Sequence, residues 1–300
     1  MLELAIVGVL SVAVGLAWAA AVRSVRQADP ASEASVRVGE ELAQRRGPRR
    51  FLRSRLDPQT VTGLALTLAL GAVIVAGAVL GVLIAMIRGS TGIVNVDAAV
   101  TRWAASHDTP LSLSVLGWVT WAGSTIGVVL VATAAAAYAV VRRRRWSAAL
   151  FLAVVVVGQF VLSNAIKLAV ARVRPDAPPL HLVTGPSFPS GHATAAAATW
   201  AAAALVLGRN ASPRIRAVLA GSAAAVAVAV ACSRVLLGAH WMSDVLGGLV
   251  LGWTWFALCA VAFGGRVLRL GQPAERATDA PTAGATAGDE EGAAARPGAA

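Results

Sequence analysis

Three short strings place phosphate-binding and proton-transferring side chains at the ends of apolar segments. They are Lys167 with Arg174-Pro175, then Pro189-Ser190-Gly191-His192, then Ser233-Arg234 followed by His240 and Asp244. The cations and the serine hydroxyl suit phosphate oxygens, whereas two imidazoles and a carboxylate can attack phosphorus and move protons. Charge is costly beside apolar segments, so residues kept there are functional candidates. Together the strings predict a metal-free phosphate-transfer site.

The first string can present two cations to one anion. Lys167 ends an apolar run, and Arg174 follows seven residues later, where Pro175 stops the helix and turns the chain along the surface. Snorkelling towards lipid headgroups would explain either cation alone. Lys167 is, however, the single lysine beside 25 arginines, and its compact charge suits phosphate. This choice favours a role in anion binding.

The second string opens an Ala-rich segment after a loop that contains five prolines, 175–191. The start of a helix offers free N–H groups and the positive end of the helix dipole, which bind phosphate. Ser190 can donate its hydroxyl or cap the helix, and Gly191 lets the backbone approach a ligand closely. Capping would explain both of these residues. It does not explain His192, whose imidazole suits proton transfer near neutral pH.

In the third string, His240 and Asp244 have the i, i+4 spacing that puts two side chains on one helix face. A carboxylate in that place can accept the imidazole Nδ1–H and leave Nε2 free as a nucleophile. A His–Asp pair that only satisfies itself is one alternative. A metal site made with His192 is another, but the nearby cations would repel a divalent ion and can neutralise a phosphoryl group themselves.

The composition predicts a polytopic membrane protein that holds these strings. The 300 residues are 57% hydrophobic and 14% charged, with a mean hydropathy of +0.69, which excludes an ordinary soluble domain. Apolar runs of about 20 residues mark membrane spans. Seven are expected, at 3–22, 61–87, 124–141, 147–168, 192–208, 215–232 and 242–264. Residues 94–107 and the start of the long run 111–141 are expected to form helices at the outer surface.

The net charge of +11 follows from membrane topology rather than from nucleic-acid binding. If residues 23–60 are cytoplasmic, 20 of the 26 Lys and Arg residues lie inside, as the positive-inside rule requires. Residues 1–22 then form an N-out anchor, because Glu3 precedes the apolar run and Arg23 follows it, unlike in a signal peptide. All three strings fall on the extracytoplasmic face of a multi-pass protein of the cell membrane.

The remaining histidines and the cysteines carry no expected chemistry. His107 and His181 have no charged companions and are expected at the surface. Cys232 and Cys259 lie inside apolar helices, where they act as small hydrophobic residues.

The strings resemble those of the type 2 phosphatidic acid phosphatase superfamily, membrane lipid phosphatases related to bacterial acid phosphatases and vanadium haloperoxidases. K-x6-R-P, P-S-G-H and S-R-x5-H-x3-D occur in this order without a departure. The resemblance implies an all-α, polytopic membrane helical bundle, with a six-span phosphatase core over 61–268 and one extra N-terminal span. Residues 1–60 would add the anchor and an Arg-rich cytoplasmic loop, and 269–300 a disordered cytoplasmic tail.

The resemblance also implies a mechanism. His240 would attack phosphorus to form a phosphohistidine, held in position by Asp244, and His192 would protonate the leaving oxygen and then activate water. The phosphate oxygens would be held by Lys167, Arg174, Ser190, Gly191 and Arg234. Neither a metal nor another cofactor is expected.

The implied substrate is a lipid phosphate or diphosphate among the membrane lipids, with no nucleic-acid partner. The candidates are a polyprenyl diphosphate, phosphatidic acid and phosphatidylglycerol phosphate, and family analogy favours an undecaprenyl-type diphosphate or broad specificity. A transferase that uses an acceptor other than water, and a lipid-phosphate binder without turnover, remain alternatives. Haloperoxidase chemistry ranks last because those relatives are soluble. The sequence gives no oligomeric state.

Overall fold

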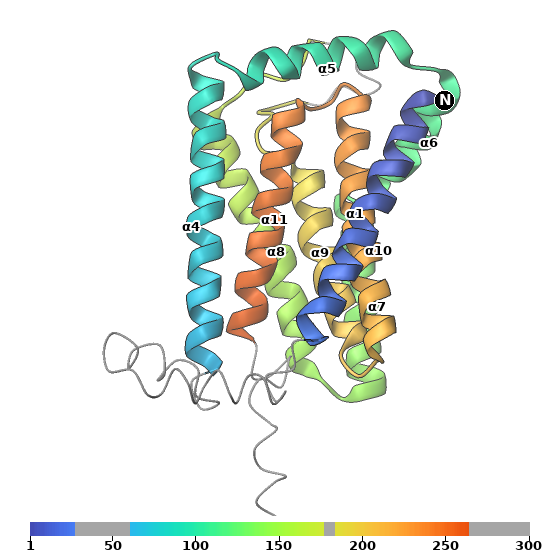
Figure 1. Ribbon diagram of the computed structural model, residues 1–300, viewed down its shortest axis with the longest axis vertical. Coiled ribbons are helices and arrows are strands. Elements are labelled where there is room, and N and C mark those ends of the chain that lie inside the picture. Colours follow the sequence, from blue (N-terminus) through green and yellow to red (C-terminus); the bar gives the residue numbers. More distant parts are fainter. Residues whose placement is uncertain (28–60, 177–183, 264–300) are drawn as a thin grey trace, which may run out of the picture.

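A computed structural model describes residues 1–27, 61–176 and 184–263 of the chain, and within them every regular element is a helix. The helices are α1 (Leu2–Gln27), α4 (Val61–Arg88), α5 (Ile93–His107), α6 (Pro110–Trp121), α7 (Thr125–Arg143), α8 (Trp146–Val170), α9 (Gly191–Gly208), α10 (Pro213–Leu236) and α11 (Met242–Ala262). The expected all-α bundle is confirmed (Figure 1). His181 lies outside the described residues.

Seven of these helices, α1, α4 and α7 to α11, are long and apolar enough to cross a membrane. They match the seven expected spans. The long apolar run is broken as expected, because α6 ends at Trp121 and Ser124 starts α7 with its hydroxyl accepting the Gly127 N–H (3.1 Å). The amphipathic segment forms α5, which lies across one end of the bundle (Figure 1). The division of the chain at residues 60 and 268 stays a prediction.

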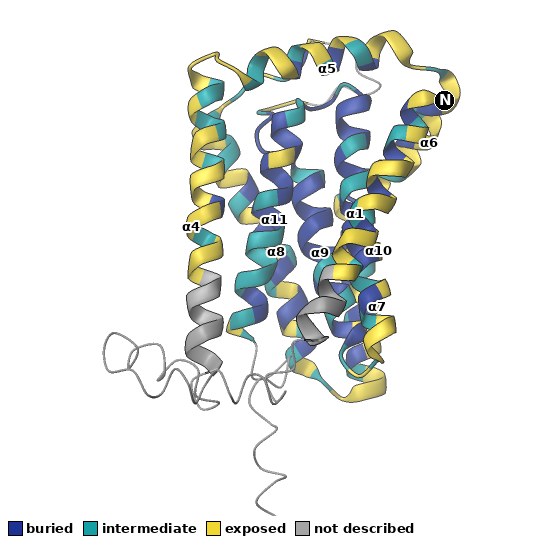
Figure 2. Ribbon diagram, viewed as in Figure 1, coloured by how far each residue is buried: buried dark blue, intermediate teal, exposed yellow. Residues whose placement is uncertain are grey.

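The helix α9 lies in the core of the bundle and contacts α7, α8, α10 and α11. Most of its alanines are buried, and Figure 2 shows α9, α10 and α11 as the most buried helices. Small residues bring α11 close to α9: a Cβ added at Gly248 would lie 2.7 Å from the Ser190 carbonyl oxygen, and one at Gly252 would lie 2.5 Å from that of Thr194. Such close approach is how membrane helices gain packing energy without a hydrophobic driving force.

The helices α1 and α4 lie at the outside of this core. The first packs on α10 through another pair of small residues, since a Cβ at Gly15 would lie 2.8 Å from the Gly221 carbonyl oxygen. The second runs along α11 and leaves most of its described surface exposed, which suits contact with lipid (Figure 2).

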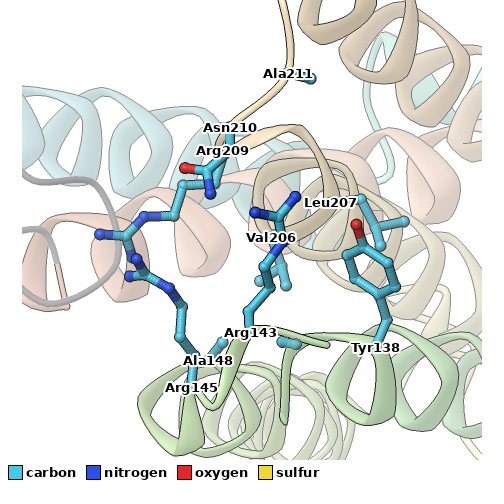
Figure 3. Close-up of a pocket in the computed structure, with 10 residues that line it drawn as sticks. Tyr138, Arg143, Arg145, Ala148, Val206, Leu207, Arg209, Asn210 and Ala211 are labelled. Atoms are coloured by element: carbon cyan, nitrogen blue, oxygen red, sulfur yellow. The ribbon is translucent and has the colours of Figure 1, made fainter. Parts of the chain in front are cut away.

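The two ends of the bundle differ in chemistry. At one end α8 finishes, α9 begins, α10 finishes and α11 begins, and α5 covers this end together with the loop before α9 (Figure 1). The opposite end carries arginines around a cavity of about 140 Å³ lined by Tyr138, Arg143, Arg145 and Arg209 among others (Figure 3). No residue of the three strings lines that cavity, so the chemistry must be sought at the first end.

Candidate active site

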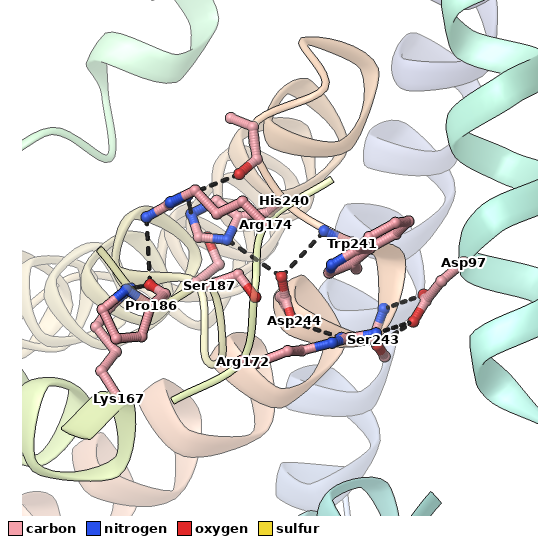
Figure 4. Close-up of polar contacts among 12 residues, drawn as sticks. Asp97, Lys167, Arg172, Arg174, Pro186, Ser187, His240, Trp241, Ser243 and Asp244 are labelled. Atoms are coloured by element: carbon pink, nitrogen blue, oxygen red, sulfur yellow. Dashed lines mark hydrogen bonds and ion pairs between the residues drawn. The ribbon is translucent and has the colours of Figure 1, made fainter. Parts of the chain in front are cut away.

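The side chains of His240 and Asp244 form a buried pair at the end of the bundle covered by α5. Nδ1 of His240 lies 3.4 Å from Oδ2 of Asp244, and Nε2 lies 3.2 Å from a guanidinium nitrogen of Arg174 (Figure 4). Arginine can only donate, so Nε2 must accept, and the imidazole proton is assigned to Nδ1, facing the carboxylate. This tautomer leaves the Nε2 lone pair directed away from Asp244, as a nucleophile requires.

The chain places His240 by turning back on the end of α10. Gly238 has φ +65°, a conformation that favours glycine, and the N–H groups of Ala239 and His240 then donate to the Arg234 carbonyl (3.1 and 3.2 Å). The expected pairing with Asp244 is present, but the assumption that both residues share a helix face is wrong. His240 precedes α11, and Asp244 in its first turn also accepts the Trp241 N–H (3.0 Å). The pair is therefore built around a helix N-terminus.

Burial keeps His240 neutral. The residue is 2% exposed, and this burial lowers the pKa of its imidazole to about 4, although the contact with Asp244 acts in the opposite direction. Burial also lowers the pKa of Arg174, but a guanidinium remains charged at neutral pH. A neutral imidazole thus faces a charged guanidinium, which is the charge state needed for attack on an anionic phosphate.

Backbone carbonyls hold two of the three predicted cations in place. Lys167 Nζ donates to the Pro186 carbonyl (2.9 Å), and Arg174 donates to the carbonyls of Gly185 (3.0 Å) and Ala239 (2.7 Å). The loop before α9 is itself fixed, because Ser190 N–H donates to the Asp244 carbonyl (2.9 Å). The segment that carries the second string therefore orients the cations of the first.

The three strings meet in a cavity of about 480 Å³. Its polar end is lined by Lys167, Arg174, Gly191, His192, Arg234 and His240. The remaining wall is mainly apolar and comes from α7 and α8, including Val128, Val129, Val156, Val157 and Phe160. Of the eight predicted site residues, only Ser190 and Asp244 do not line it, and both are fully buried behind it. One space thus joins a cationic end to an apolar wall.

Several donors at this cavity lack partners within the described part of the chain. The buried hydroxyls of Ser163 and Ser190 and the Nε–H of Arg234 have none. Ser190 precedes α9 at the N-cap position, yet its hydroxyl makes no capping bond, so capping does not explain its presence. Buried donors are almost always satisfied in folded proteins, so this group of donors suits an anion with several oxygens.

A second charged cluster lies behind the His240–Asp244 pair, and sequence reasoning missed it. Arg172 donates from one guanidinium nitrogen to Asp244 Oδ1 (2.7 Å) and from the other to Asp97 Oδ2 of α5 (2.7 Å). Ser243 donates its N–H to Asp97 Oδ1 (2.9 Å). A charged residue two positions before Arg174 was a signal for Arg172, but no pattern in the sequence pairs it with Asp97. Ser163, four residues before Lys167, was missed as well.

Of the residues expected to lack chemistry, the three that the structure describes are not among those that line the cavity. His107 is exposed and close to the Trp103 carbonyl (Nδ1 at 2.9 Å). Cys232 and Cys259 are unpaired, and Cys259 is buried in the apolar core.

Comparison with known proteins agrees with this geometry. A family model described as the PAP2 superfamily matches residues 146–267, which contain all three strings. Phosphatidylglycerophosphatase B of Bacillus subtilis is 30% identical over 169 residues, covering 55% of this chain and 81% of that protein. The chain belongs to the PAP2 superfamily.

The crystal structure of the transmembrane PAP2-type phosphatidylglycerolphosphate phosphatase from Bacillus subtilis is similar, with a TM-score of 0.56 and 29% sequence identity. The match covers 65% of this chain and 97% of that one, so nearly all of the solved PAP2 structure has a counterpart here. Together with the seven apolar helices, it identifies this PAP2 protein as a multi-pass membrane protein.

Two other relatives match over a shorter region. A lipid A 1-phosphatase of Rhizobium johnstonii is 39% identical over 121 residues, 37% of this chain and 45% of that protein. A decaprenylphosphoryl-5-phosphoribose phosphatase of Mycobacterium tuberculosis is 41% identical over 105 residues, 34% of this chain and 53% of that protein. The chain thus spans about half the length of these two relatives.

Proposed function

We propose that this PAP2 protein is a lipid phosphatase of the cell membrane that hydrolyses lipid phosphates or diphosphates on the extracytoplasmic face, through a phosphohistidine on His240. The observation that carries the proposal is the position of His240 Nε2. It lies in contact with Arg174 at a cavity with a cationic end and an apolar wall. The names of the relatives, all lipid phosphatases, support the same class of substrate.

The proposed first step transfers the phosphoryl group to the enzyme. His240 Nε2 attacks phosphorus and the bond from phosphorus to the lipid oxygen breaks, while His192 gives its proton to that leaving oxygen. As the imidazole gains positive charge, Asp244 stabilises it. Lys167, Arg174 and Arg234 neutralise the oxygens of the transferring group, the work that a metal does elsewhere.

The proposed second step releases phosphate. His192, now neutral, takes a proton from water, and the oxygen of that water attacks phosphorus as the bond to Nε2 breaks. The donors of Ser163, Ser190 and Arg234 that find no partner among the described residues would hold oxygens in both steps. Because no step needs a metal ion, activity should persist in a chelator.

The apolar wall supports an amphiphilic substrate. Val157 and Phe160 line the cavity, yet they are 61% and 58% exposed, so the cavity opens along α8 towards lipid. A lipid tail can remain among these side chains while its phosphate reaches the cationic end. We propose polyprenyl diphosphate, phosphatidic acid and phosphatidylglycerol phosphate as candidate substrates.

The test is phosphate release by the purified protein in detergent with EDTA, over a panel of lipid phosphates and diphosphates. Wild type should release phosphate in EDTA, and His240→Ala should lose at least about a thousandfold of that rate. His107→Ala is the matched control, because it removes an exposed imidazole away from the cavity. The proposal is refuted if wild type binds these lipids without turnover. If the phosphoryl group passes to an acceptor other than water, the protein is a transferase.

A further inference from the structure

The buried cluster behind the nucleophile links α5, which lies across the end of the bundle, to the reacting imidazole. Asp97 and Asp244 are fully buried, and the Arg172 side chain between them is 8% exposed. Each carboxylate contacts a different guanidinium nitrogen at 2.7 Å. The result is one continuous chain of contacts from Asp97 through Arg172 and Asp244 to His240 (Figure 4).

The position of Arg172 differs from that of the phosphate-binding cations. Arg174 contacts Nε2 of His240, whereas Arg172 contacts the Asp244 oxygen that does not face the imidazole. Neither Arg172 nor Asp97 is among the described residues that line the 480 Å³ cavity. Arg172 therefore lies on the far side of the pair from the site where phosphate would bind.

This geometry fixes the orientation of the Asp244 carboxylate. Oδ1 accepts from Arg172, and Oδ2 accepts from Trp241 N–H and faces His240 Nδ1. If Arg172 moves, Oδ1 loses its donor in a buried environment, and the Trp241 N–H alone among these donors still holds the carboxylate against turning away from the imidazole. The nucleophile then loses both its tautomer control and the stabilisation of its developing charge.

Asp97 fixes Arg172 in turn. Its Oδ2 accepts from Arg172 and from the Ser243 hydroxyl (2.5 Å), and the Trp241 ring lies 5.3 Å from the guanidinium carbon. Without the Asp97 charge, Arg172 would keep Asp244 as its sole ionic partner among the described residues. Ionic contacts from both terminal nitrogens fix the orientation of a guanidinium group, whereas a contact from one nitrogen alone lets the group rotate.

We propose that Asp97 and Arg172 are positioning residues, through which the surface helix α5 sets the orientation of Asp244 and His240 for catalysis. The inference rests on the proposed function, in which His240 is the nucleophile. Its signature is a loss of kcat without a loss of anion binding, because the cations that bind phosphate are not touched.

The test compares Asp97→Asn with Asp108→Asn, the same change at an exposed position immediately after α5. The asparagine of Asp97→Asn keeps an oxygen for the Ser243 N–H, so docking of α5 is retained while the charge facing Arg172 is lost. We expect kcat to fall about tenfold to hundredfold. KM and the inhibition constant of inorganic phosphate should stay within about twofold, because the cations that bind phosphate are unchanged, and Asp108→Asn should match wild type.

A double-mutant cycle separates positioning from general stability. In an Asp244→Asn background, Asp97→Asn should lower kcat by less than about a further twofold, because its effect passes through Asp244. An equal loss of kcat in both backgrounds, or a weaker affinity for inorganic phosphate in the single variant, would overturn the inference. Unchanged kcat in Asp97→Asn would do the same. If Asp97→Asn does not fold, Arg172→Lys provides the same comparison, since lysine keeps the charge but has no fork to bridge two carboxylates.

The proposed function and this inference fail in different ways. A wild-type protein without turnover, or an active His240→Ala variant, refutes the nucleophile itself. The other case is that wild type is active, His240→Ala is inactive and Asp97→Asn is fully active. This result supports the phosphatase and refutes only the role of α5.

Discussion

Gly191→Ala should separate ligand binding from folding at the start of α9. A Cβ at this position would lie 3.9 Å from Lys167 Cε and from Ser163 Oγ, which is ordinary contact, and the residue does not have the positive φ that favours glycine. The folded state therefore accepts alanine, and the free energy of unfolding should stay equal or rise by about 0.4–1 kcal/mol. The added methyl group would nevertheless stand where the cavity meets the N–H groups of α9.

The cost should appear in catalysis. The loss of one hydrogen bond between a backbone N–H and a charged phosphate costs about 1.5–3 kcal/mol, so kcat/KM should fall about tenfold to 150-fold. The assay is phosphate release in detergent, with thermal unfolding followed in the same buffer. Two glycines serve as controls: Gly117→Ala, which lies in α6 and meets nothing within 4 Å, should leave kcat/KM unchanged and keep or raise the stability as Gly191→Ala does. Gly248→Ala, whose Cβ would lie 2.7 Å from the Ser190 carbonyl oxygen, should lower the unfolding temperature.

Full activity in Gly191→Ala would show that phosphate does not approach the start of α9. Equal losses of stability in the variants at 191 and 248 would show instead that both glycines serve packing. The proposed site requires that Gly191→Ala keeps its stability against unfolding and has a lower kcat/KM.

Three further outcomes are expected. Because burial lowers the pKa of His240 to about 4, its imidazole should stay neutral as the pH falls through 6.5 and gain a proton only near pH 4. A 15N NMR titration, with the His240 signal assigned by its loss in His240→Asn, measures this pKa. A midpoint near pH 6.5 would contradict the prediction. Arg234→Lys should keep the charge but lose the Nε–H that has no partner among the described residues, so kcat should fall about tenfold to a hundredfold. The control is Thr120→Ser, which keeps the hydroxyl that accepts from Arg234 and should leave kcat unchanged. A membrane-impermeant maleimide added to intact cells should label Asp176→Cys but not Arg144→Cys, and the reverse pattern would refute an extracytoplasmic site.

Most of the fold could be predicted because each span carries its own signal. A helix that crosses a membrane needs a run of apolar residues, and the start of α7 at Ser124 is marked by a capping residue inside one such run. The site could be predicted for a related reason. Charged and imidazole side chains stand out at the ends of apolar helices, so the sequence predicts Lys167, His192 and Arg234 as candidates one residue at a time, and the structure places all three at one cavity.

The contacts between distant segments could not be predicted in this way. Asp97 and Arg172 are 75 residues apart, and each alone suits an ordinary surface position. Likewise, the i, i+4 spacing indicated a helical turn, whereas the chain around Gly238 places His240 before α11 and lets Asp244 accept from the Trp241 N–H. Which donors lack a partner depends on the packing of several helices, so the sequence could not show that the Ser190 hydroxyl makes no capping bond.

A last prediction concerns the apolar wall of the cavity and tests the proposed lipid substrate. Val157 lines the cavity on α8 and is 61% exposed, whereas Val161, one turn further along the same helix, is 57% exposed and is not among the lining residues. Phenylalanine at 157 should fill the space beside Phe160 and obstruct a lipid tail, at a cost of about 1–3 kcal/mol. The phenylalanine of Val161→Phe should face lipid and leave kcat/KM unchanged.

The assay compares a long-chain lipid phosphate with a short, water-soluble phosphomonoester that reaches only the cationic end. Val157→Phe should lower kcat/KM for the long-chain substrate about fivefold to 150-fold, from the cost above, and leave the soluble substrate unchanged. Val161→Phe should act like wild type on both. An equal loss on both substrates would mean that the substitution disturbs His240 and the cations rather than the tail. If kcat/KM falls for neither substrate, the lipid reaches the site by another path than the space between α7 and α8. The chemistry at the polar end is compatible with such a path.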